Sequence, residues 1–211
     1  MDIKNLRLNY KKSTIDFKNS VENPIQYFMN WFKDALKVNK QEANACVLST
    51  ISSDNCPSSR VVLLKEVNES GFTFFTNYKS NKANDIDENP NVALNFYWPE
   101  LERQVRITGT ARKNSINESD TYFASRPRDS QMGAWLSDQS KAVGLDFNFI
   151  DTLDFLENRF KDKEVTRPLH WGGYCVTPIK VEFWQGRPSR LHDRLVYEIE
   201  GNKWTKKRLA P

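Results

Sequence analysis

The segment from Trp184 to Arg194 carries side chains that could act on a small ligand. Its sequence, WQGRPSRLHDR, holds three arginines and one of only two histidines in the chain. If residues 190–194 run extended, Arg190, His192 and Arg194 point to one side, because side chains alternate along a strand. Two guanidinium groups beside an imidazole suit an anionic ligand that contains nitrogen. Taken alone, however, so polar a segment is more typical of an exposed, solvated loop.

A second group of polar side chains lies between residues 122 and 130. Tyr122 and Arg126 are four residues apart, so they share one face if the segment is helical. Pro127 disfavours helical geometry at Arg126 and ends the segment there. A turn can then bring the Ser130 hydroxyl to the phenol and the guanidinium, and the three groups would form a phosphate-binding site. The alternative is a helix C-terminus at which the arginine complements the helix dipole.

Basic residues also stand at two other places where an anion could bind: at both ends of an aliphatic strand, and in the first turn of a short predicted helix. Arg60 and Lys65 are the two ends of RVVLLK, and alternation sends them to opposite faces, where they can bind two different anions. Further on, Ser80-Asn81-Lys82 begins a predicted helix whose free backbone N–H groups and lysine can hold a phosphate. Each pattern also has a simpler interpretation, which is favoured when the pattern is taken alone. The first is then a buried strand with charged ends, and the second is an ordinary serine cap.

Composition and missing motifs argue against several function classes. The net charge is +4, and basic and acidic residues are interleaved, which is a weak signal for nucleic-acid binding. The three cysteines, Cys46, Cys56 and Cys175, lack a CxxC pair and nearby histidines, so we expect no disulfide framework and no metal site. The sequence contains no G-x-G-x-x-G, P-loop, HExxH or G-x-S-x-G motif.

The chain also lacks the sequence signals of secretion and membrane insertion. Its first twenty residues have no apolar core of a signal peptide. No apolar run approaches the roughly 20 residues that span a bilayer. We therefore expect a cytoplasmic protein that does not bind membranes.

The elements that must position these residues are mostly short strands. We predict a flexible arm over residues 1–20 and a single domain over residues 21–211. The domain begins with a helix that Asn23 caps. The predicted strands cover residues 46–53, 59–67, 72–77, 92–98, 103–112, 173–185, 195–200 and 203–208, with further helices at 80–88, 115–125 and 147–161. Short strands with tight turns favour an α+β fold, mainly antiparallel β and shaped as a barrel, over a parallel doubly wound sheet.

Taken together, these motifs resemble the pyridoxine/pyridoxamine 5′-phosphate oxidase family. The resemblance extends from Arg7 to Pro211 and rests on the number and order of the motifs rather than on any one of them. They are RVVLLK (60–65), LERQV (101–105), SRPRDSQ (125–131), GAW (133–135), DQS (138–140), EFWQG (182–186), RLHDR (190–194) and RLAP (208–211).

The resemblance implies a fold, a cofactor and a reaction. Members of the family fold as an FMN-binding split barrel with flanking helices, and act as homodimers in which both subunits contribute to each flavin site. They oxidise pyridoxine 5′-phosphate or pyridoxamine 5′-phosphate to pyridoxal 5′-phosphate, a step of vitamin B6 metabolism. Flavin N5 accepts a hydride equivalent from substrate C4′, and dioxygen reoxidises the flavin and leaves as hydrogen peroxide.

The resemblance also implies roles for residues of this sequence. Arg190 and His192 would lie against the substrate ring near C4′ as the catalytic pair. FMN would be bound by Arg60, Val61, Val62, Leu63, Leu64, Lys65, Phe75, Thr76, Asn81, Lys82, Gln104, Gln139, Ser140, Trp184 and Arg194. The substrate would contact Lys65, Tyr122, Arg126 and Ser130 at its phosphate, Arg190, Leu191 and His192 at its ring, and Arg7 and Tyr10 from the arm.

Two other function classes stay open on the sequence. A non-catalytic flavin- or pyridoxal-phosphate-binding barrel would keep the phosphate contacts but would not need Arg190 and His192. A basic nucleic-acid-binding barrel would bind RNA or DNA with a strong salt dependence, and the interleaved charge disfavours it. The role of His192 is also open: beside two arginines it stays neutral and able to accept a proton, or it orients the substrate ring.

Overall fold

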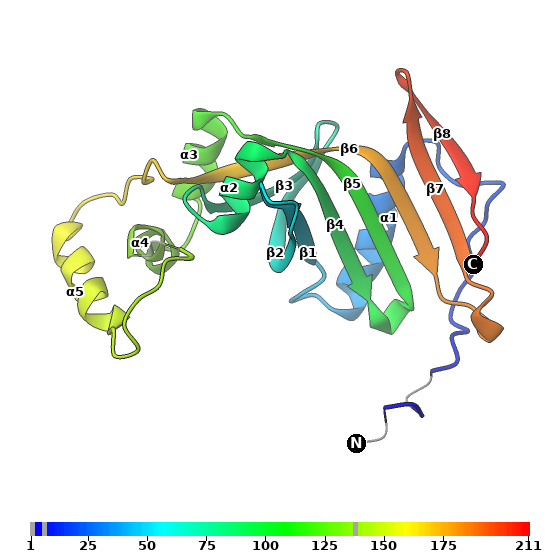
Figure 1. The fold of residues 1–211 in the computed structure, drawn as a ribbon, viewed down its shortest axis with the longest axis horizontal. Coiled ribbons are helices and arrows are strands. Elements are labelled where there is room, and N and C mark those ends of the chain that lie inside the picture. The colour runs from blue at the N-terminus through cyan, green and yellow to red at the C-terminus, as the bar shows by residue number, and fades with distance from the viewer. Residues whose placement is uncertain (1–2, 6–7, 137–138) are drawn as a thin grey trace.

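An antiparallel barrel forms the centre of the computed structural model, which describes residues 3–5, 8–136 and 139–211 (Figure 1). Over these residues the sheet has the order β3-β2-β1-β4-β5-β6-β7-β8, and a further pairing of β3 with β6 closes its first six strands into the barrel. The strands are β1 (Ala45–Ile51), β2 (Pro57–Asn68), β3 (Gly71–Asn77), β4 (Asn91–Trp98), β5 (Arg103–Lys113), β6 (Trp171–Gln185), β7 (Asp193–Glu200) and β8 (Lys203–Arg208).

Strand β6, which has 15 residues, links the barrel to a hairpin. One of its edges is shared between two neighbours: the first residues pair with β3, starting at Trp171, and the last pair with β7, ending at Gln185. Strand β5 runs along the other edge for almost the whole length. Strands β7 and β8 therefore extend the sheet beyond the closed barrel, as Figure 1 shows.

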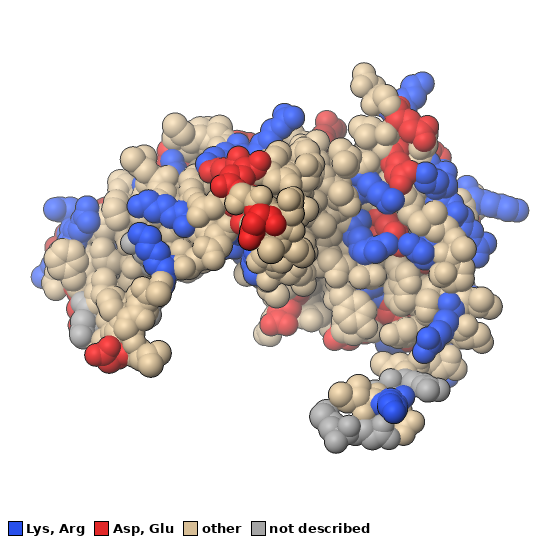
Figure 2. All heavy atoms as spheres, in the orientation of Figure 1, with Lys and Arg blue, Asp and Glu red and all other residues tan. Residues whose placement is uncertain are grey.

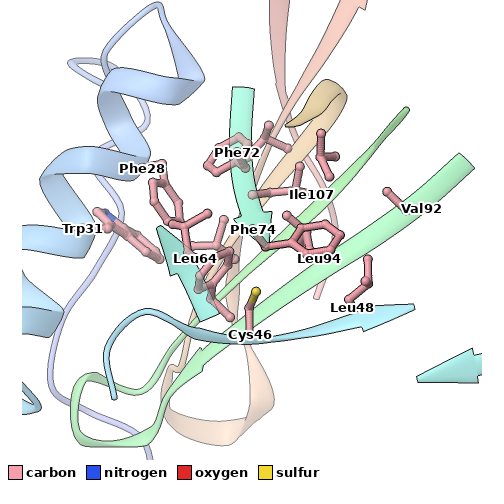
Figure 3. Packing of buried hydrophobic residues seen from close by; sticks show 14 of the residues in the cluster. Phe28, Trp31, Cys46, Leu48, Leu64, Phe72, Phe74, Val92, Leu94 and Ile107 are labelled. Atoms are coloured by element: carbon pink, nitrogen blue, oxygen red, sulfur yellow. The ribbon is translucent and has the colours of Figure 1, made fainter. Parts of the chain in front are cut away.

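Helix α1 (Pro24–Val38) packs against the barrel and completes its core. Asn23 caps the helix, because its side chain accepts hydrogen bonds from N–H groups of the first turn. The Phe28 side chain is fully buried, and its ring centre lies 5.0 Å from those of Phe72 and Phe96. Figure 3 shows Phe28 pointing from the helix toward Phe72 and the other strand residues of this core.

Three further helices form a second, smaller core with the start of β6. In this core α3, α4 and α5 bury Phe123, Met132 and Leu156 together with Trp171. These helices and the remaining short elements are α2 (Asn81–Glu88), α3 (Ile116–Ala124), α4 (Arg128–Leu136), α5 (Phe149–Arg159) and the 3₁₀ turns Pro99–Leu101 and Pro188–Arg190.

The sequence patterns do not predict α4. The helix contains Gly133, which lowers helix propensity by about 1 kcal/mol relative to alanine. Its stabilising contacts come from residues far along the chain: Arg128 donates a hydrogen bond to Phe160 O at 2.7 Å, and Trp135 Nε1 donates to Thr166 O at 2.7 Å. Tertiary contacts therefore stabilise this helix, and a local sequence pattern cannot predict such contacts.

Residues 8–20 of the predicted arm lie against the domain. Ile15 is 5% exposed and belongs to the main core, and its N–H donates to Asp193 Oδ2 at 3.2 Å. The Lys11 N–H donates to Glu102 Oε2 at 2.8 Å. The domain boundary predicted at residue 20 therefore falls within one packed body.

The mainly antiparallel α+β fold predicted from the sequence is confirmed. Each predicted strand and helix is present, with ends within two residues of those predicted. The β7–β8 hairpin turns at Gly201, whose φ of 62° suits glycine. Within the described residues, no helix is long and apolar enough to cross a membrane.

We expect Phe28→Ala to lower the free energy of unfolding by about 3–5 kcal/mol, because it empties a fully buried site between α1 and the strands. Urea-induced unfolding measures this loss. Phe155→Ala is the control: its side chain is 66% exposed on α5, and the same free energy should change by less than about 0.5 kcal/mol. Equal losses in the two variants would contradict this description of the core.

Candidate active site

A cavity of about 500 Å³ lies between β2, β3, α3 and α4. Its lining combines apolar residues of β2 with polar, cationic and aromatic side chains of the neighbouring elements. The lining residues are Val61, Val62, Leu63, Lys65, Phe75, Thr76, Lys82, Tyr122, Ser125, Arg126, Pro127, Ser130, Gln139 and Trp171. The four residues predicted to contact the substrate phosphate, Lys65, Tyr122, Arg126 and Ser130, therefore lie around one space, which we call the phosphate cavity.

The guanidinium group of Arg126 lies over an aromatic ring and has an unpaired nitrogen. Its Cζ is 4.5 Å from the centre of the Trp171 ring. Its Nη1 is buried and has no hydrogen-bond partner in the described part of the chain, and burial lowers the pKa of Arg126. A buried donor without a partner costs about 1–3 kcal/mol, so an anionic acceptor bound here would stabilise the protein.

Tyr122 completes the aromatic side of the phosphate cavity. Its ring stacks on Phe75 at a centroid distance of 3.9 Å and lies nearly parallel to Trp171 at 6.2 Å. Burial raises the pKa of Tyr122, so the phenol keeps its proton at neutral pH and can donate a hydrogen bond. Tyr122 lies in the last turn of α3 and Arg126 just after the helix, so the predicted pair does meet at one cavity.

Residues from three segments meet beside this aromatic wall. Thr76 Oγ1 and Lys82 Nζ both donate hydrogen bonds to Gln139 Oε1, at 3.2 and 3.0 Å. The Asn81 N–H donates to Ser140 Oγ at 3.4 Å. The structure therefore brings together five residues predicted to bind FMN, from β3, from α2 and from the loop after α4.

The ammonium group of Lys82 lies near a second cation. Burial, reinforced by the positive charge of Arg60, lowers the pKa of Lys82 to about 8. Arg60 is on the opposite face of β2 from Lys65, as alternation predicts, and its guanidinium contacts Thr50 Oγ1 at 2.7 Å and Asp85 at 3.8 Å. One carboxylate balances at most one of the two cations, so a phosphate would be attracted here.

Ser80 stands at the N-terminus of α2 without capping it. Its side chain makes no capping hydrogen bond and instead donates to Asn77 O at 2.7 Å. The ordinary serine cap, the simpler interpretation of the sequence, is therefore wrong. N–H groups in the first turn of α2 can therefore donate to other acceptors, and the Asn81 N–H donates to Ser140 Oγ.

Strand β2 turns alternate residues toward the surface and the core. Val61, Leu63 and Lys65 are exposed, whereas Leu64 is 5% exposed and packs in the main core. Both the N–H and the C=O of Leu64 are hydrogen-bonded to Asn44. Leu64 therefore lies outside the phosphate cavity, although the family resemblance includes it among the flavin contacts.

A second group of predicted residues lies at the other end of β6. Gln104 pairs with Trp184 across β5 and β6, and Trp184 pairs with Arg194 across β6 and β7, so these three residues form one row, the Trp184 row. The Trp184 ring centre lies 4.6 Å from that of His192 and 5.7 Å from that of Tyr10. Beside it a second cavity of about 500 Å³, the ring cavity, is lined by Leu8, Asn9, Tyr10, Arg187, Ser189, Arg190 and His192.

The segment before β7 is a turn rather than an extended strand. Residues 188–190 form a 3₁₀ turn in which Arg190 has a φ of 61°, and β7 begins only at Asp193. The prediction that Arg190, His192 and Arg194 alternate along one extended segment is therefore wrong. The proline that starts the turn fixes its own φ and favours this bend. The turn nevertheless leaves Arg190 and His192 in one cavity.

One ring nitrogen of His192 is already engaged. Its Nδ1 accepts a hydrogen bond from the Arg187 N–H at 3.1 Å, so the neutral ring carries its proton on Nε2. Burial and the positive charge of Arg190 lower the pKa of His192. At neutral pH the ring is therefore uncharged and has an N–H donor at Nε2.

The predicted site residues thus fall into two groups at opposite ends of β6. Trp171 lines the phosphate cavity and Trp184 contacts the residues of the ring cavity, and they are 184 − 171 = 13 residues apart. This separation is roughly 40 Å along the strand, and one protomer does not bring the groups together. Leu191 is 66% exposed and lines neither cavity, and Arg7 lies outside the described residues.

Trp171 and Arg187 are parts of these sites that sequence reasoning missed. Two glycines follow Trp171, and a Cβ added to Gly173 would lie 2.9 Å from the Phe75 ring, so a larger residue there would crowd the aromatic side of the phosphate cavity. No pattern singled out the backbone N–H of Arg187. The other histidine of the chain, His170, holds two segments together, because its Nε2 lies 3.0 Å from Ala134 O.

Two family models match the chain. Residues 32–151 match the model described as pyridoxamine 5′-phosphate oxidase, and residues 171–211 match the model described as pyridoxine 5′-phosphate oxidase C-terminal dimerisation region. The chain belongs to the pyridoxamine 5′-phosphate oxidase family. Two relatives named pyridoxine/pyridoxamine 5′-phosphate oxidase support this. That of Cyanothece sp. is 48% identical over 100% of this chain and 99% of its own, and that of Rubrobacter xylanophilus is 49% identical over 100% and 97%.

Solved structures show the same fold. PhzG from Burkholderia lata 383, in complex with tetrahydrophenazine-1-carboxylic acid, has a TM-score of 0.89 and 26% identity, over 97% of this chain and 100% of its own. A pyridoxamine 5′-phosphate oxidase-related, FMN binding protein from Nostoc punctiforme has a TM-score of 0.71 and 14% identity, over 87% and 97%. The split barrel predicted from the sequence is therefore confirmed.

Membership of the pyridoxamine 5′-phosphate oxidase family points to a flavin, and the residues of the two groups fit one. Arg60 and Lys82 provide more positive charge than Asp85 balances, which suits the phosphate of FMN. Trp184 provides an aromatic surface for a ring system. Among the described residues, no cluster of three or more His, Cys, Asp or Glu could hold a metal ion.

We expect the affinity of the apoprotein for FMN to fall as the pH rises above about 8, because Lys82 then loses its proton and its attraction for phosphate. Quenching of flavin fluorescence measures the Kd across this range. Lys82→Met should bind FMN more weakly at neutral pH and show a flatter profile. Lys79→Met, which removes an exposed neighbouring lysine, is the control. A wild-type profile that persists in Lys82→Met would rule out this role.

Proposed function

We propose that this protein oxidises pyridoxamine 5′-phosphate and pyridoxine 5′-phosphate to pyridoxal 5′-phosphate, with FMN as cofactor and dioxygen as acceptor, and releases hydrogen peroxide. The observation that carries the proposal is the phosphate cavity, in which Arg126, with its unpaired buried nitrogen, meets Lys65, Tyr122 and Ser130. Two cations and two hydroxyl groups suit a phosphate monoester.

Residues from both groups would hold the cofactor. On the side of the phosphate cavity these are Arg60, Val61, Val62, Leu63, Lys65, Phe75, Thr76, Asn81, Lys82, Gln139 and Ser140, with Leu64 supporting them from the core. On the other side they are Gln104, Trp184 and Arg194. When bound, FMN supplies the electron-accepting chemistry, with dioxygen as the final acceptor.

The residues of the chain itself would bind and orient the substrate. Lys65 and Arg126 would neutralise its phosphate, and Arg190 and His192 would contact its pyridine ring. Because His192 carries its proton on Nε2, it would donate a hydrogen bond to the ring, which favours orientation of the substrate over removal of a proton. Tyr10, whose ring centre lies 5.8 Å from that of His192, would cover the bound ring.

A homodimer would bring the two groups of residues together. Strand β2 lies between β1 and β3, yet Val61 and Leu63 on its surface are 66% and 46% exposed. Adjacent exposed apolar residues on such a strand are typical of a surface that a partner covers. The description of the C-terminal family region as a dimerisation region supports this arrangement. Each site would combine the phosphate cavity of one subunit with the Trp184 row of the other.

The solved relative PhzG raises a second class of substrate, a ring system that carries a carboxylate instead of a phosphate. Two features favour the phosphate here. The phosphate cavity has both Lys65 and Arg126, whereas a single carboxylate needs fewer donors. The relatives that share nearly half of the residues of this chain are named for phosphorylated vitamin B6 compounds.

A carrier role and nucleic-acid binding have less support. A non-catalytic carrier would not need Arg190 and His192 in a cavity beside the Trp184 row. Nucleic-acid binding is disfavoured because the Lys and Arg side chains over β7 and β8 are interleaved with Asp and Glu, as Figure 2 shows. We assign the protein to the cytoplasm, because a reducing compartment keeps thiols such as Cys46, Cys56 and Cys175 free.

The purified protein should be yellow and should release hydrogen peroxide when it is given pyridoxamine 5′-phosphate. Arg126→Gln should raise KM for this substrate about tenfold to a hundredfold, because it removes a charged hydrogen bond to the phosphate. A coupled peroxidase assay measures both. Unphosphorylated pyridoxamine is the matched control substrate, and its slow turnover should not respond to Arg126→Gln. A colourless protein that stays inactive after FMN is added would refute the proposal.

Separate replacement of Arg190 and His192 by alanine distinguishes the oxidase from a carrier. Both variants should keep the bound-flavin spectrum and lose most of their turnover, because neither side chain belongs to the flavin-binding set while both line the ring cavity. Steady-state kinetics and an absorption spectrum of each variant are sufficient. Unchanged turnover in both variants would favour a protein whose ring cavity takes no part in chemistry.

A further inference from the structure

A buried carboxylate, Glu182, lies between two arginines on the sheet. Its side chain is shielded from solvent, and the residue is 3% exposed. Oε1 accepts a hydrogen bond from Arg194 Nε at 2.8 Å, and Oε2 accepts one from Arg106 Nη2. Burial alone would raise the pKa of Glu182, but the hydrogen bonds from Arg194 and Arg106 outweigh it, and the pKa lies below its ordinary value. Glu182 is therefore charged at neutral pH.

This carboxylate stands directly beside the Trp184 row. Glu182 and Trp184 point to the same face of β6, because side chains alternate along a strand. On β5, Arg106 pairs with Glu182 just as Gln104 pairs with Trp184. Gln104 Nε2 in turn donates to Asn95 Oδ1 at 2.8 Å on β4. Two adjacent rows of side chains therefore lie on the same face of the sheet. One contains the ion pairs of Glu182, and the other is the Trp184 row with the proposed flavin contacts.

The C-terminal tail holds another nitrogen of the Arg194 guanidinium group. Arg194 Nη1 donates to Ala210 O at 3.0 Å, and the Leu209 N–H donates back to Arg194 O at 3.0 Å. Because Nε is bonded to Glu182, Nη2 is the guanidinium nitrogen without a hydrogen bond to the described residues. A planar guanidinium group held at two nitrogens has a fixed orientation.

We propose that Glu182 is a positioning residue which, with the Ala210 carbonyl, orients Arg194 for contact with the flavin. The inference rests on the proposed role of Arg194 in binding FMN. In Glu182→Gln, a single neutral amide oxygen is left to accept from two arginines, so the hydrogen bond to Arg194 Nε is weakened or lost to Arg106, and the guanidinium groups of Arg106 and Arg194 repel each other without a negative charge between them. Arg194 then leaves the orientation that binds the cofactor, and flavin affinity falls although every flavin-contacting residue is still present.

A double-mutant cycle on flavin affinity tests this inference. The Kd for FMN is measured by quenching of flavin fluorescence in the wild-type apoprotein, Glu182→Gln, Arg194→Gln and the double variant. We expect Glu182→Gln to raise the Kd about tenfold when Arg194 is present and less than about twofold when Arg194 is already replaced, because the effect passes through Arg194. Thermal unfolding of each apoprotein separates these changes from a loss of stability.

Glu198→Gln is the matched control. Glu198 is also a carboxylate bound by two cations, Lys180 and Lys207, and it lies on β7 as Arg194 does. Its cations are thus distinct from Arg194. Its replacement removes a carboxylate with two cationic partners from the strand that carries Arg194, although this side chain is 26% exposed and that of Glu182 is 4% exposed, and it should leave the Kd for FMN unchanged.

Equal effects of Glu182→Gln in the presence and absence of Arg194 would overturn the inference, because they would show a structural role only. If Arg194→Gln alone leaves the Kd unchanged, the flavin role of Arg194 fails first, which is a distinct result. If Glu182→Gln does not fold, the cycle is run with a chain that ends at Arg208 and lacks the Ala210 carbonyl. A Kd for FMN that this truncation does not raise would equally overturn the inference.

Discussion

The division of one edge of β6 between two neighbours is the constraint on which the molecule depends. The start of the strand pairs with β3 and closes the barrel, and its end pairs with β7 and begins the hairpin. A residue on that edge has one set of backbone groups and cannot serve both partners. Two binding surfaces therefore arise at the two ends of one strand, around Trp171 and around Trp184. In our proposal, a second copy of the chain brings them together.

The two surfaces differ in how their cations are held. In the phosphate cavity, Arg126 has an unpaired buried nitrogen, and burial, together with the charge of Arg60, lowers the pKa of Lys82. Such cations destabilise the protein when no ligand is bound, and a bound anion relieves this cost. This surface therefore suits phosphate groups. At the other surface, the carboxylate of Glu182 lies between Arg106 and Arg194 and, in our proposal, holds Arg194 in one orientation. A guanidinium group held in this way makes directional hydrogen bonds to a ligand.

Features of this site that follow from local geometry were predictable from the sequence. The spacing of Tyr122 and Arg126 and the alternation between Arg60 and Lys65 are examples. The turn at Arg190 was not, because Arg190 has a positive φ and arginine is not among the residues that favour that region. Helix α4 and the contact of Arg126 with the Trp171 ring depend on residues distant in the chain, and no periodic pattern predicts such contacts. Family resemblance grouped the residues, but only the structure shows that they form two surfaces.

The central claim, that each active site combines surfaces of two subunits, is tested most directly by subunit complementation. Arg126→Glu disables the phosphate cavity and Arg190→Ala disables the ring cavity, and each variant alone should be inactive. When equal amounts of the two are co-expressed, half of the dimers are mixed, and each mixed dimer has one intact site, so about one quarter of wild-type peroxide release should return. If each site lay within one subunit, every site would carry one of the two changes, and a mixture as inactive as its components would contradict the claim.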